Sequence, residues 1–290
     1  MAKRGGRGGK RKVSLISMLI VLMVFGLTQN WQKLEKRLDA SFTIAGGTTA
    51  KTASSANSNE DTINNTTESS LVNLDYVAGK SAVINVNNDR STLNFADWHT
   101  NQVNYSNLDN LNRTANVNTA YLEARNLAND LLRERQYVQP TGWHQKYVNK
   151  TPIINRGHLI AYSLSKGIAS NGQYDTSLES GDQNNPKNLF TQTAFSNQKI
   201  QTIYESRIRD ALRRGHKVIF AAHAIFRGNE LMARGGVQLQ AISDDGSLNF
   251  NVFIFNVQPG VTFDYATGRS RIDKQMKVPS PPSTPRFHNY

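Results

Sequence analysis

A polar tetrapeptide, Asn155-Arg156-Gly157-His158, lies between apolar residues within the stretch 153–160. This pattern is typical of a strand end that presents one titratable imidazole. A neutral histidine is the natural group for taking a proton from water near pH 7. Asn188, Asn197 and Glu205 follow thirty to forty-seven residues downstream, and they carry the oxygen atoms that a hard cation and its water shell prefer. Together these residues suggest metal-assisted hydrolysis of a phosphodiester.

Each of these side chains also has a structural interpretation. His158 alone is more often a satisfied core histidine, and only the downstream set favours the catalytic role. Asn188 follows a proline and a lysine and can cap a turn, while Asn197 can be the N-cap of the helix that follows it. Glu205 can form an i,i+4 ion pair with Arg209. The residue types alone leave these alternatives open.

The composition limits the class of protein. The chain has 290 residues and no cysteine, which excludes structural disulfides and thiolate zinc sites. Its formal net charge is +12, and six of the positive charges lie in the first twelve residues, which leaves +6 for the rest. A basic body favours a polyanionic partner such as nucleic acid. The sequence contains no glycine-rich phosphate loop and no dinucleotide fingerprint, which argues against a nucleotide cofactor.

The first thirty residues have the charge pattern of a membrane or secretory segment. An uncharged run of sixteen residues, 13–28, follows the cationic residues. As a helix at ~1.5 Å per residue it spans roughly 24 Å, which fits a short membrane anchor or a secretory signal. No small-x-small cleavage site follows closely, which favours an uncleaved anchor. Because excess Lys and Arg stay in the cytoplasm, we expect a membrane-anchored protein with an extracellular domain, or a secreted one.

A polar segment separates this run from the expected folded domain. Between residues 48 and 70, fifteen of twenty-three residues are Ser, Thr or Asn. Such a segment cannot bury enough apolar surface to offset the entropy of ordering it. The sequence therefore predicts a flexible tether over 31–72, a folded domain over 73–278 and a frayed tail over 279–290.

Strand and helix patterns alternate within the folded domain. Two segments repeat apolar residues at helical spacing: 117–131, which ends before Pro140, and 200–212, which Gly215 closes. The combination predicts an α+β fold with a mostly antiparallel sheet. The expected strands are 83–86, 93–98, 217–222 and 248–257.

The ordered set of polar motifs resembles the DNA/RNA non-specific endonuclease family of the ββα-metal superfamily. The resemblance rests on Asn155-Arg156-Gly157-His158, then Asn188-Leu189-Phe190-Thr191-Gln192, then Asn197-Gln198 and then Glu205. Residues 76–265 are similar to the streptococcal DNA-entry nucleases, which an N-terminal hydrophobic helix anchors. The resemblance implies a ββα-metal core with helices flanking the antiparallel sheet. One departure is that the family usually has Asp at the position of Asn155, so the negative charge beside the imidazole is missing here.

The resemblance also implies a role for each residue. His158 would be the general base, and Asn197 would hold a hydrated Mg²⁺ ion, with Mn²⁺ as a substitute. Glu205 would orient the metal-bound waters, Asn188 would brace the motif or the histidine, and Arg156 would contact phosphate. The implied substrate is DNA, and also RNA, cut with little sequence preference.

Other charged residues admit two interpretations. Arg209 and Arg213 make the second helix basic; a solvated face is the default interpretation, and the implied substrate favours phosphate binding. The remaining histidines show no zinc-ligand spacing, and no segment indicates an obligate protein partner. A rival function is an extracellular protein that captures DNA with a degenerate nuclease site, which the neutral Asn155 favours. The acidic residues Asp175, Glu179 and Asp182 could hold a second cation, although a solvated loop is the simpler interpretation.

Overall fold

The computed structural model describes residues 62–63 and 68–281. The predicted anchor or signal lies outside the described residues, as do most of the tether and the tail beyond residue 281. None of the helices in the described part of the chain has the length and apolar character needed to span a membrane.

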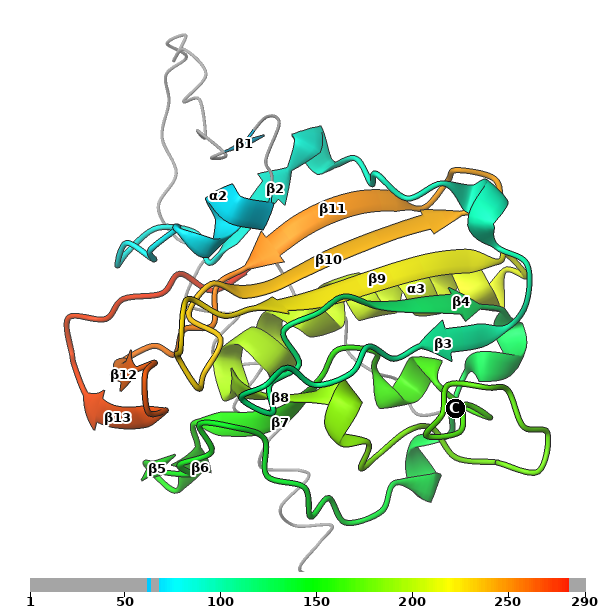
Figure 1. Cartoon of the computed structure of the whole chain (residues 1–290). Coiled ribbons are helices and arrows are strands. Elements are labelled where there is room, and N and C mark those ends of the chain that lie inside the picture. Colours follow the sequence, from blue (N-terminus) through cyan, green and yellow to red (C-terminus); the bar gives the residue numbers. More distant parts are fainter. Residues whose placement is uncertain (1–61, 64–67, 282–290) are drawn as a thin grey trace, which may run out of the picture. The chain divides into compact units, whose positions relative to one another are not determined.

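The centre of the described region is a seven-stranded sheet with the order β1-β2-β11-β10-β9-β4-β3 (Figure 1). Every neighbouring pair is antiparallel except β1 and β2. This sheet, with one long helix, confirms the predicted α+β class. The strands are β1 (Thr62–Ile63), β2 (Val83–Val86), β3 (Gln102–Asn104), β4 (Asn118–Leu122), β9 (Val218–Ile225), β10 (Gly236–Ser243) and β11 (Asn249–Ile254).

The sequence explains why β9 is an interior strand of the sheet. All eight of its residues are buried, because both faces of the strand are covered and the run is almost entirely apolar. The helix α3 (Thr202–Arg213) runs along one face (Figure 1). Ile208, Ala211 and Leu212 of this helix are completely buried in the core, so α3 is fixed against the sheet.

A short antiparallel pair precedes α3 and carries the polar motifs. β7 (Ile154–His158) pairs with β8 (Leu189–Thr193), with Asn155 opposite Gln192 and His158 opposite Leu189. A π-helical turn, η7 (Ser196–Gln201), then leads directly into α3. The predicted strand end with its imidazole is therefore confirmed, and β7, β8 and α3 form a ββα unit beside the main sheet.

Two small hairpins pack beside β7. A second apolar cluster, made of Ile153, Ile154, Met232, Val261 and Phe263, joins them to the strand. The hairpins are β5 (Tyr147–Val148) with β6 (Thr151–Pro152), and β12 (Val261–Asp264) with β13 (Arg269–Ile272).

The remaining described elements are short. They lie between strands of the main sheet, between the sheet and the β5–β6 hairpin, and between β7 and β8. They are α2 (Glu68–Val72) and the 3₁₀ turns η1 (Asn87–Asp89), η2 (Phe95–Asp97), η3 (Ala124–Asn126), η4 (Asp130–Leu132), η5 (Tyr162–Leu164) and η6 (Pro186–Asn188).

The predicted helix over 117–131 is wrong. The segment forms β4 and then the turns η3 and η4. In β4 burial alternates, with Asn118, Ala120 and Leu122 buried, and the strand hydrogen-bonds to both β3 and β9. Pairing within the sheet therefore overrides the helical spacing, and Leu131, expected on the buried face, is 88% exposed.

Two strand predictions also differ from the structure. Residues 93–98 form the turn η2 rather than a strand, because the Asn94 side chain accepts a hydrogen bond from Ala96 N and caps the turn. The strand β10 was not predicted at all, although it lies between β9 and β11. By contrast, the helix ending near Gly215 is confirmed, and this glycine has the left-handed φ of 89° expected of a helix C-cap.

Candidate active site

A polar cleft opens beside the ββα unit. Its volume is about 530 Å³, and its walls come from β7, α3, η7 and the segment 133–147. The structure brings five of the predicted site residues to this cleft: Arg156, His158, Asn197, Glu205 and Arg209.

His158 is placed at the end of β7 and is partly buried. Its Nε2 atom is buried and has no hydrogen-bond partner. Burial lowers the pKa of His158, the negative charge of Asp182 opposes this effect, and the positive charge of Arg133 adds to it. The imidazole is therefore held in its neutral form near pH 7, which is the form that accepts a proton.

Asn188 lies behind the cleft rather than in it, and its side chain is completely buried. Its Oδ1 accepts a hydrogen bond from Ile160 N at 2.8 Å, and its Nδ2 donates to Ile160 O at 2.9 Å. Its backbone O also accepts from Leu159 N at 2.9 Å. Asn188 thus holds the two residues that follow His158, as a brace would.

Asn197 is oriented by hydrogen bonds from both sides. Its Oδ1 accepts from Asn155 Nδ2 at 3.1 Å, and its Nδ2 donates to Gln192 Oε1 at 2.9 Å. The amide group therefore has one defined orientation. Asn155 can donate this bond because it is an amide, whereas the carboxylate usual in the family could not donate it.

Gln192 extends this network toward α3. Its Nε2 donates to Gln201 Oε1 at 2.9 Å and to Ser196 Oγ at 3.1 Å. Gln201 Nε2 donates in turn to His158 O at 2.8 Å and to Glu205 Oε1 at 2.9 Å. The chain of amides links Asn197, the backbone of His158 and Glu205 in one rigid unit.

Glu205 belongs both to the cleft and to an ion pair. It lines the cleft, and its Oε2 lies 3.7 Å from Arg209 Nη1. Burial raises the pKa of Glu205, while Arg209, Gln201 and Arg133 oppose this shift. Arg209 is itself buried and donates to Ser163 Oγ at 2.8 Å and to Ser206 Oγ at 2.5 Å. The ion-pair interpretation and the site interpretation of Glu205 are therefore compatible.

The arginines of the region differ in their placement. Arg156 lines the cleft, lies 4.5 Å from the centre of the Trp143 ring and donates to Val138 O. Arg213, predicted to bind substrate, is not brought to the cleft: it pairs with Asp210 at 2.8 Å, and both side chains are more than half exposed. Its position on the helix turns it toward solvent rather than toward the cleft.

The cleft residues fit a hard cation. Asn197 offers an amide oxygen of fixed orientation, and Glu205 is a carboxylate in the same cleft. Oxygen donors and space for several waters suit a cation such as Mg²⁺, which dehydrates reluctantly.

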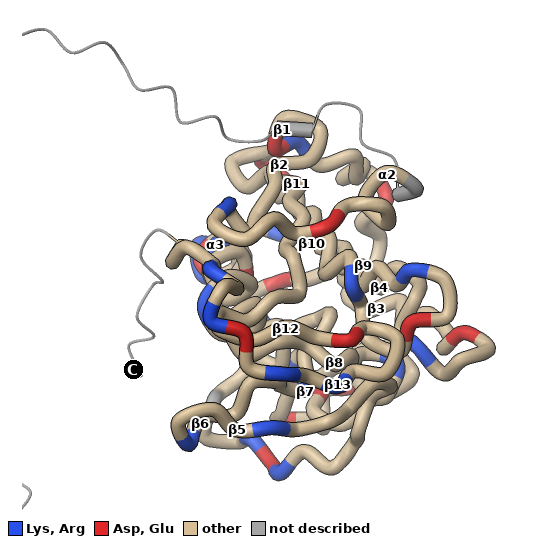
Figure 2. Tube along the Cα trace, turned by 90° about the vertical axis from the view of Figure 1, so that its left-hand side faces the viewer, with Lys and Arg blue, Asp and Glu red and all other residues tan. Residues whose placement is uncertain are grey.

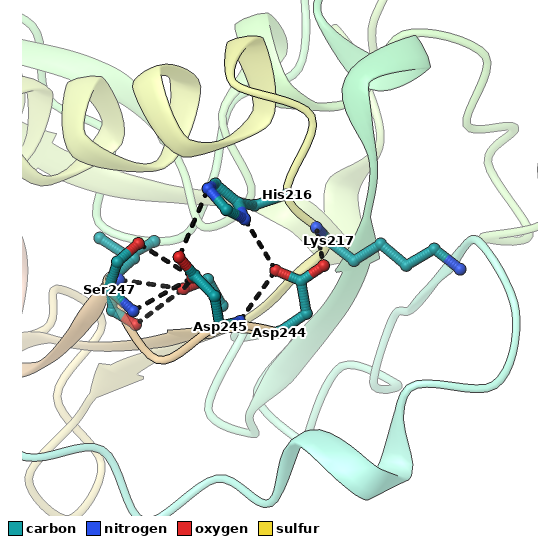
Figure 3. A network of polar contacts seen from close by, with 7 residues as sticks. His216, Lys217, Asp244, Asp245 and Ser247 are labelled. Carbon is teal, nitrogen blue, oxygen red and sulfur yellow. Dashed lines mark hydrogen bonds and ion pairs between the residues drawn. The ribbon is translucent and has the colours of Figure 1, made fainter.

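A different group joins His216 to two carboxylates at the far end of α3 (Figure 3). His216 Nδ1 lies 3.0 Å from Asp244 Oδ1, and Nε2 lies 3.4 Å from Asp245 Oδ2. Hydrogen bonds from Ser243 and Ser247, and the charge of His216, lower the pKa of Asp245 to about 2. None of the three side chains lines the cleft, and the group joins the α3–β9 turn to the β10–β11 turn.

The chain belongs to the DNA/RNA non-specific endonuclease family. The model of this family matches residues 92–244, a range that contains every motif residue described above. The protein is therefore a nuclease, and nucleic acid is its substrate.

Two solved structures of NucA from Streptococcus agalactiae are similar to this chain. One has a bound magnesium ion, with 32% sequence identity and a TM-score of 0.55 over 68% of this chain and 90% of that chain. The other has no metal, with 31% identity and the same TM-score and coverage. This similarity confirms the predicted nuclease fold.

Two site features escaped sequence reasoning. Gln192 stood inside a recognised motif, yet only its position opposite Asn155 in the β7–β8 pair reveals its contacts. Asp182 was interpreted as part of a solvated loop, but it is only 8% exposed. No periodicity marks this loop, so its burial could not be inferred from the sequence.

Proposed function

We propose that this nuclease is a Mg²⁺-dependent endonuclease that hydrolyses DNA and RNA with His158 as general base. The observation that carries the proposal is the buried Nε2 of His158, which has no hydrogen-bond partner and belongs to the same cleft as Asn197 and Glu205. A buried polar atom without a partner is costly, and an attacking water molecule would satisfy it.

The residues have separate tasks in this proposal. His158 takes the proton from the attacking water, while Gln201 holds its backbone carbonyl and Asn188 holds the backbone that follows it. Asn197 holds the hydrated cation, and Glu205 accepts hydrogen bonds from its waters. The cation, when bound, supplies positive charge to the phosphate and the leaving oxygen. The cation would therefore neutralise the charge on the leaving oxygen, while His158 removes the proton from the water.

Cationic side chains around the cleft support phosphate binding. Arg133 and Arg156 line it together with Arg209, and guanidinium groups match phosphate geometry. Basic positions continue along the β5–β6 hairpin and β13 (Figure 2), where Lys150, Arg269 and Arg271 are exposed. Phosphate contacts carry no sequence information, which supports cleavage with little sequence preference.

Cleavage of supercoiled plasmid tests the proposal directly. The chain with Mg²⁺ is expected to convert plasmid to a smear of fragments, EDTA to stop the reaction, and restored Mg²⁺ to restart it. His158→Ala is expected to slow cleavage by roughly 10²- to 10⁴-fold with unchanged DNA binding. The exposed His99 gives the matched control, because His99→Ala removes an imidazole outside the cleft. Activity in EDTA, or full activity of His158→Ala, contradicts the proposal.

The same assay separates the rival function of DNA capture. A capture protein would retain DNA in a gel-shift experiment and leave the plasmid intact at every Mg²⁺ concentration. The structure favours cleavage because Asn155 supports the orientation of Asn197 and does not disrupt it.

We also propose that residues 1–30 anchor the protein and that the nuclease domain, 73–278, lies outside the cell behind the tether. The cationic N-terminus and the apolar run after it support this orientation. Protease added to intact cells is expected to release an active fragment that begins within residues 41–72. Release of the domain only after lysis contradicts the orientation, and a secreted form without residues 1–30 indicates a cleaved signal.

A further inference from the structure

A buried carboxylate, Asp182, lies in the loop between β7 and β8. Its Oδ1 accepts a hydrogen bond from Asn185 N at 3.2 Å, and its Oδ2 accepts from Asn188 Nδ2 at 3.2 Å. Its own backbone N donates to Ser165 Oγ at 2.9 Å. None of the ion pairs between described residues includes this carboxylate. The position of Asp182 is thus fixed, while its charge has no permanent cationic partner.

Two structural connections lead from Asp182 to His158. His158 pairs with Leu189 in the β7–β8 ladder; Asn188, directly before Leu189, holds both Asp182 and the backbone of Ile160. In addition, His158 and Gln183, the residue after Asp182, line one cavity. The backbone of Gln183 and Asp182 also acts to raise the pKa of His158. Asn188 therefore links the carboxylate to the segment that follows His158, and the residue next to Asp182 borders the same cavity as the imidazole.

The charge of Asp182 acts on two neighbouring side chains. Burial lowers the pKa of His158, and Asp182 is the largest influence that opposes this effect. The Tyr105 hydroxyl is buried without a hydrogen-bond partner, and its pKa is raised well above its ordinary value by burial and then by the charge of Asp182. The other charged groups that line the cleft or the cavity around the imidazole are Arg133, Glu134, Arg135, Arg156, Glu205 and Arg209.

We propose that Asp182 is a positioning residue for His158, whose carboxylate stabilises the imidazolium that forms when His158 takes a proton from water. The proposal rests on the function proposed above. A buried carboxylate without a cation is costly, and the imidazolium supplies that cation at the moment of reaction. The proton taken from water stays on the imidazole, where it pairs with the carboxylate, until it passes to solvent.

The proposal also explains how this chain functions with a neutral residue at position 155. Asn155 donates a hydrogen bond to Asn197 and, being neutral, places no negative charge near the imidazole. In this chain the acid comes instead from the loop between β7 and β8. The motif strand orients the metal ligand, and the loop supplies the charge.

Asp182→Asn tests this assignment, with Asp175→Asn as the matched control. Asp175 is an exposed residue of the same loop, and among the described residues its carboxylate bonds only to Ser177. In metal-free protein, the midpoint of the NMR titration of the His158 imidazole is expected to move to lower pH in Asp182→Asn and to stay unchanged in Asp175→Asn. The plateau cleavage rate of Asp182→Asn is expected to fall about 10- to 100-fold, with the acid limb at lower pH. A reduced rate with an unmoved titration would mean a merely structural role and would overturn the proposal.

A measurement on the unsubstituted chain covers the case in which Asp182→Asn does not fold. The ¹³C carboxyl signal of Asp182 is expected to shift through the midpoint of the His158 titration, because the two charges interact. A carboxyl signal that does not shift as His158 titrates contradicts the proposal. These titrations need neither metal nor substrate, so their failure is distinguishable from failure of the proposed nuclease mechanism.

Discussion

Gly157→Ala is expected to disrupt the hydrogen bonds that the Gln192 side chain makes with neighbouring amide groups. A Cβ atom at position 157 would lie 2.3 Å from Gln192 Oε1 and 2.6 Å from Gln192 Cβ. Gln192 is completely buried, and its amide hydrogen-bonds to Asn197, Ser196 and Gln201. Since Gln192 Cβ is fixed to the β8 backbone, the clash cannot be relieved by rotating the side chain alone.

The magnitude follows from two contributions. Overpacking in a well-packed region costs about 1–3 kcal/mol, and each buried hydrogen bond that Gln192 loses adds about 1 kcal/mol. With two bonds lost, the free energy of unfolding falls by about 3–5 kcal/mol. For a domain of this size each kcal/mol lowers Tm by about 2–4 °C, so Tm is expected to fall by roughly 6–20 °C. Asn197 also loses a partner, so more Mg²⁺ is needed for half-maximal activity.

Calorimetry and a Mg²⁺ titration of the cleavage rate measure these effects. Gly246→Ala is the control, because a Cβ there meets nothing within 4 Å while φ is 71°. Gly246→Ala costs about 1–2 kcal/mol of backbone strain, which Gly157→Ala does not incur because Gly157 has no positive φ, and it leaves the Mg²⁺ requirement unchanged. If Gly157→Ala melts within about 2 °C of the unsubstituted chain and needs no more Mg²⁺, the packing argument is wrong.

Three further predictions concern pH, the arginines and salt. Because burial lowers the pKa of His158 below the usual 6.5, half-maximal cleavage on the acid side is expected below pH 6.5, and falling pH inactivates the base by protonating it; an acid limb above 6.5 contradicts this. Arg209→Ala is expected to destabilise the fold by about 3–5 kcal/mol, since it leaves Glu205 buried without its partner, whereas Arg213→Ala changes stability by less than about 0.5 kcal/mol and leaves cleavage intact; similar melting curves for the two variants refute this difference. Binding of catalytically inactive protein to DNA is expected to weaken steeply as salt rises, and salt-independent binding in a gel-shift titration contradicts phosphate recognition.

The ordered polar motifs made the residues of the cleft predictable from the sequence. The residues that hold them in place could not be predicted in this way. His158, Asn197 and Glu205 were identified because their types and order indicate one chemistry, and the structure gathers them in one cleft. Gln201 and Asp182 have ordinary polar environments in the sequence. Gln201 acts through a hydrogen bond to the backbone of His158, far away in the chain, and Asp182 through the burial of its loop.

The elements of the fold also differ in how far the sequence predicts them. The helix α3 and the strands β2, β9 and β11 carry strong local patterns, and each forms close to the predicted residues. β4 has helical spacing, yet hydrogen bonds to β3 and β9 make it a strand. Sheet pairing of this kind depends on the tertiary structure, so sequence periodicity alone could not reveal it.

Chemical rescue of His158→Gly by imidazole tests the central claim most directly. The account predicts that this variant cleaves DNA roughly 10²- to 10⁴-fold more slowly and that free imidazole restores part of the rate in the presence of Mg²⁺. Rescue is expected to increase with pH, because only neutral imidazole accepts the proton. Cleavage by His158→Gly at the unsubstituted rate without imidazole would contradict the assignment of His158 as the general base.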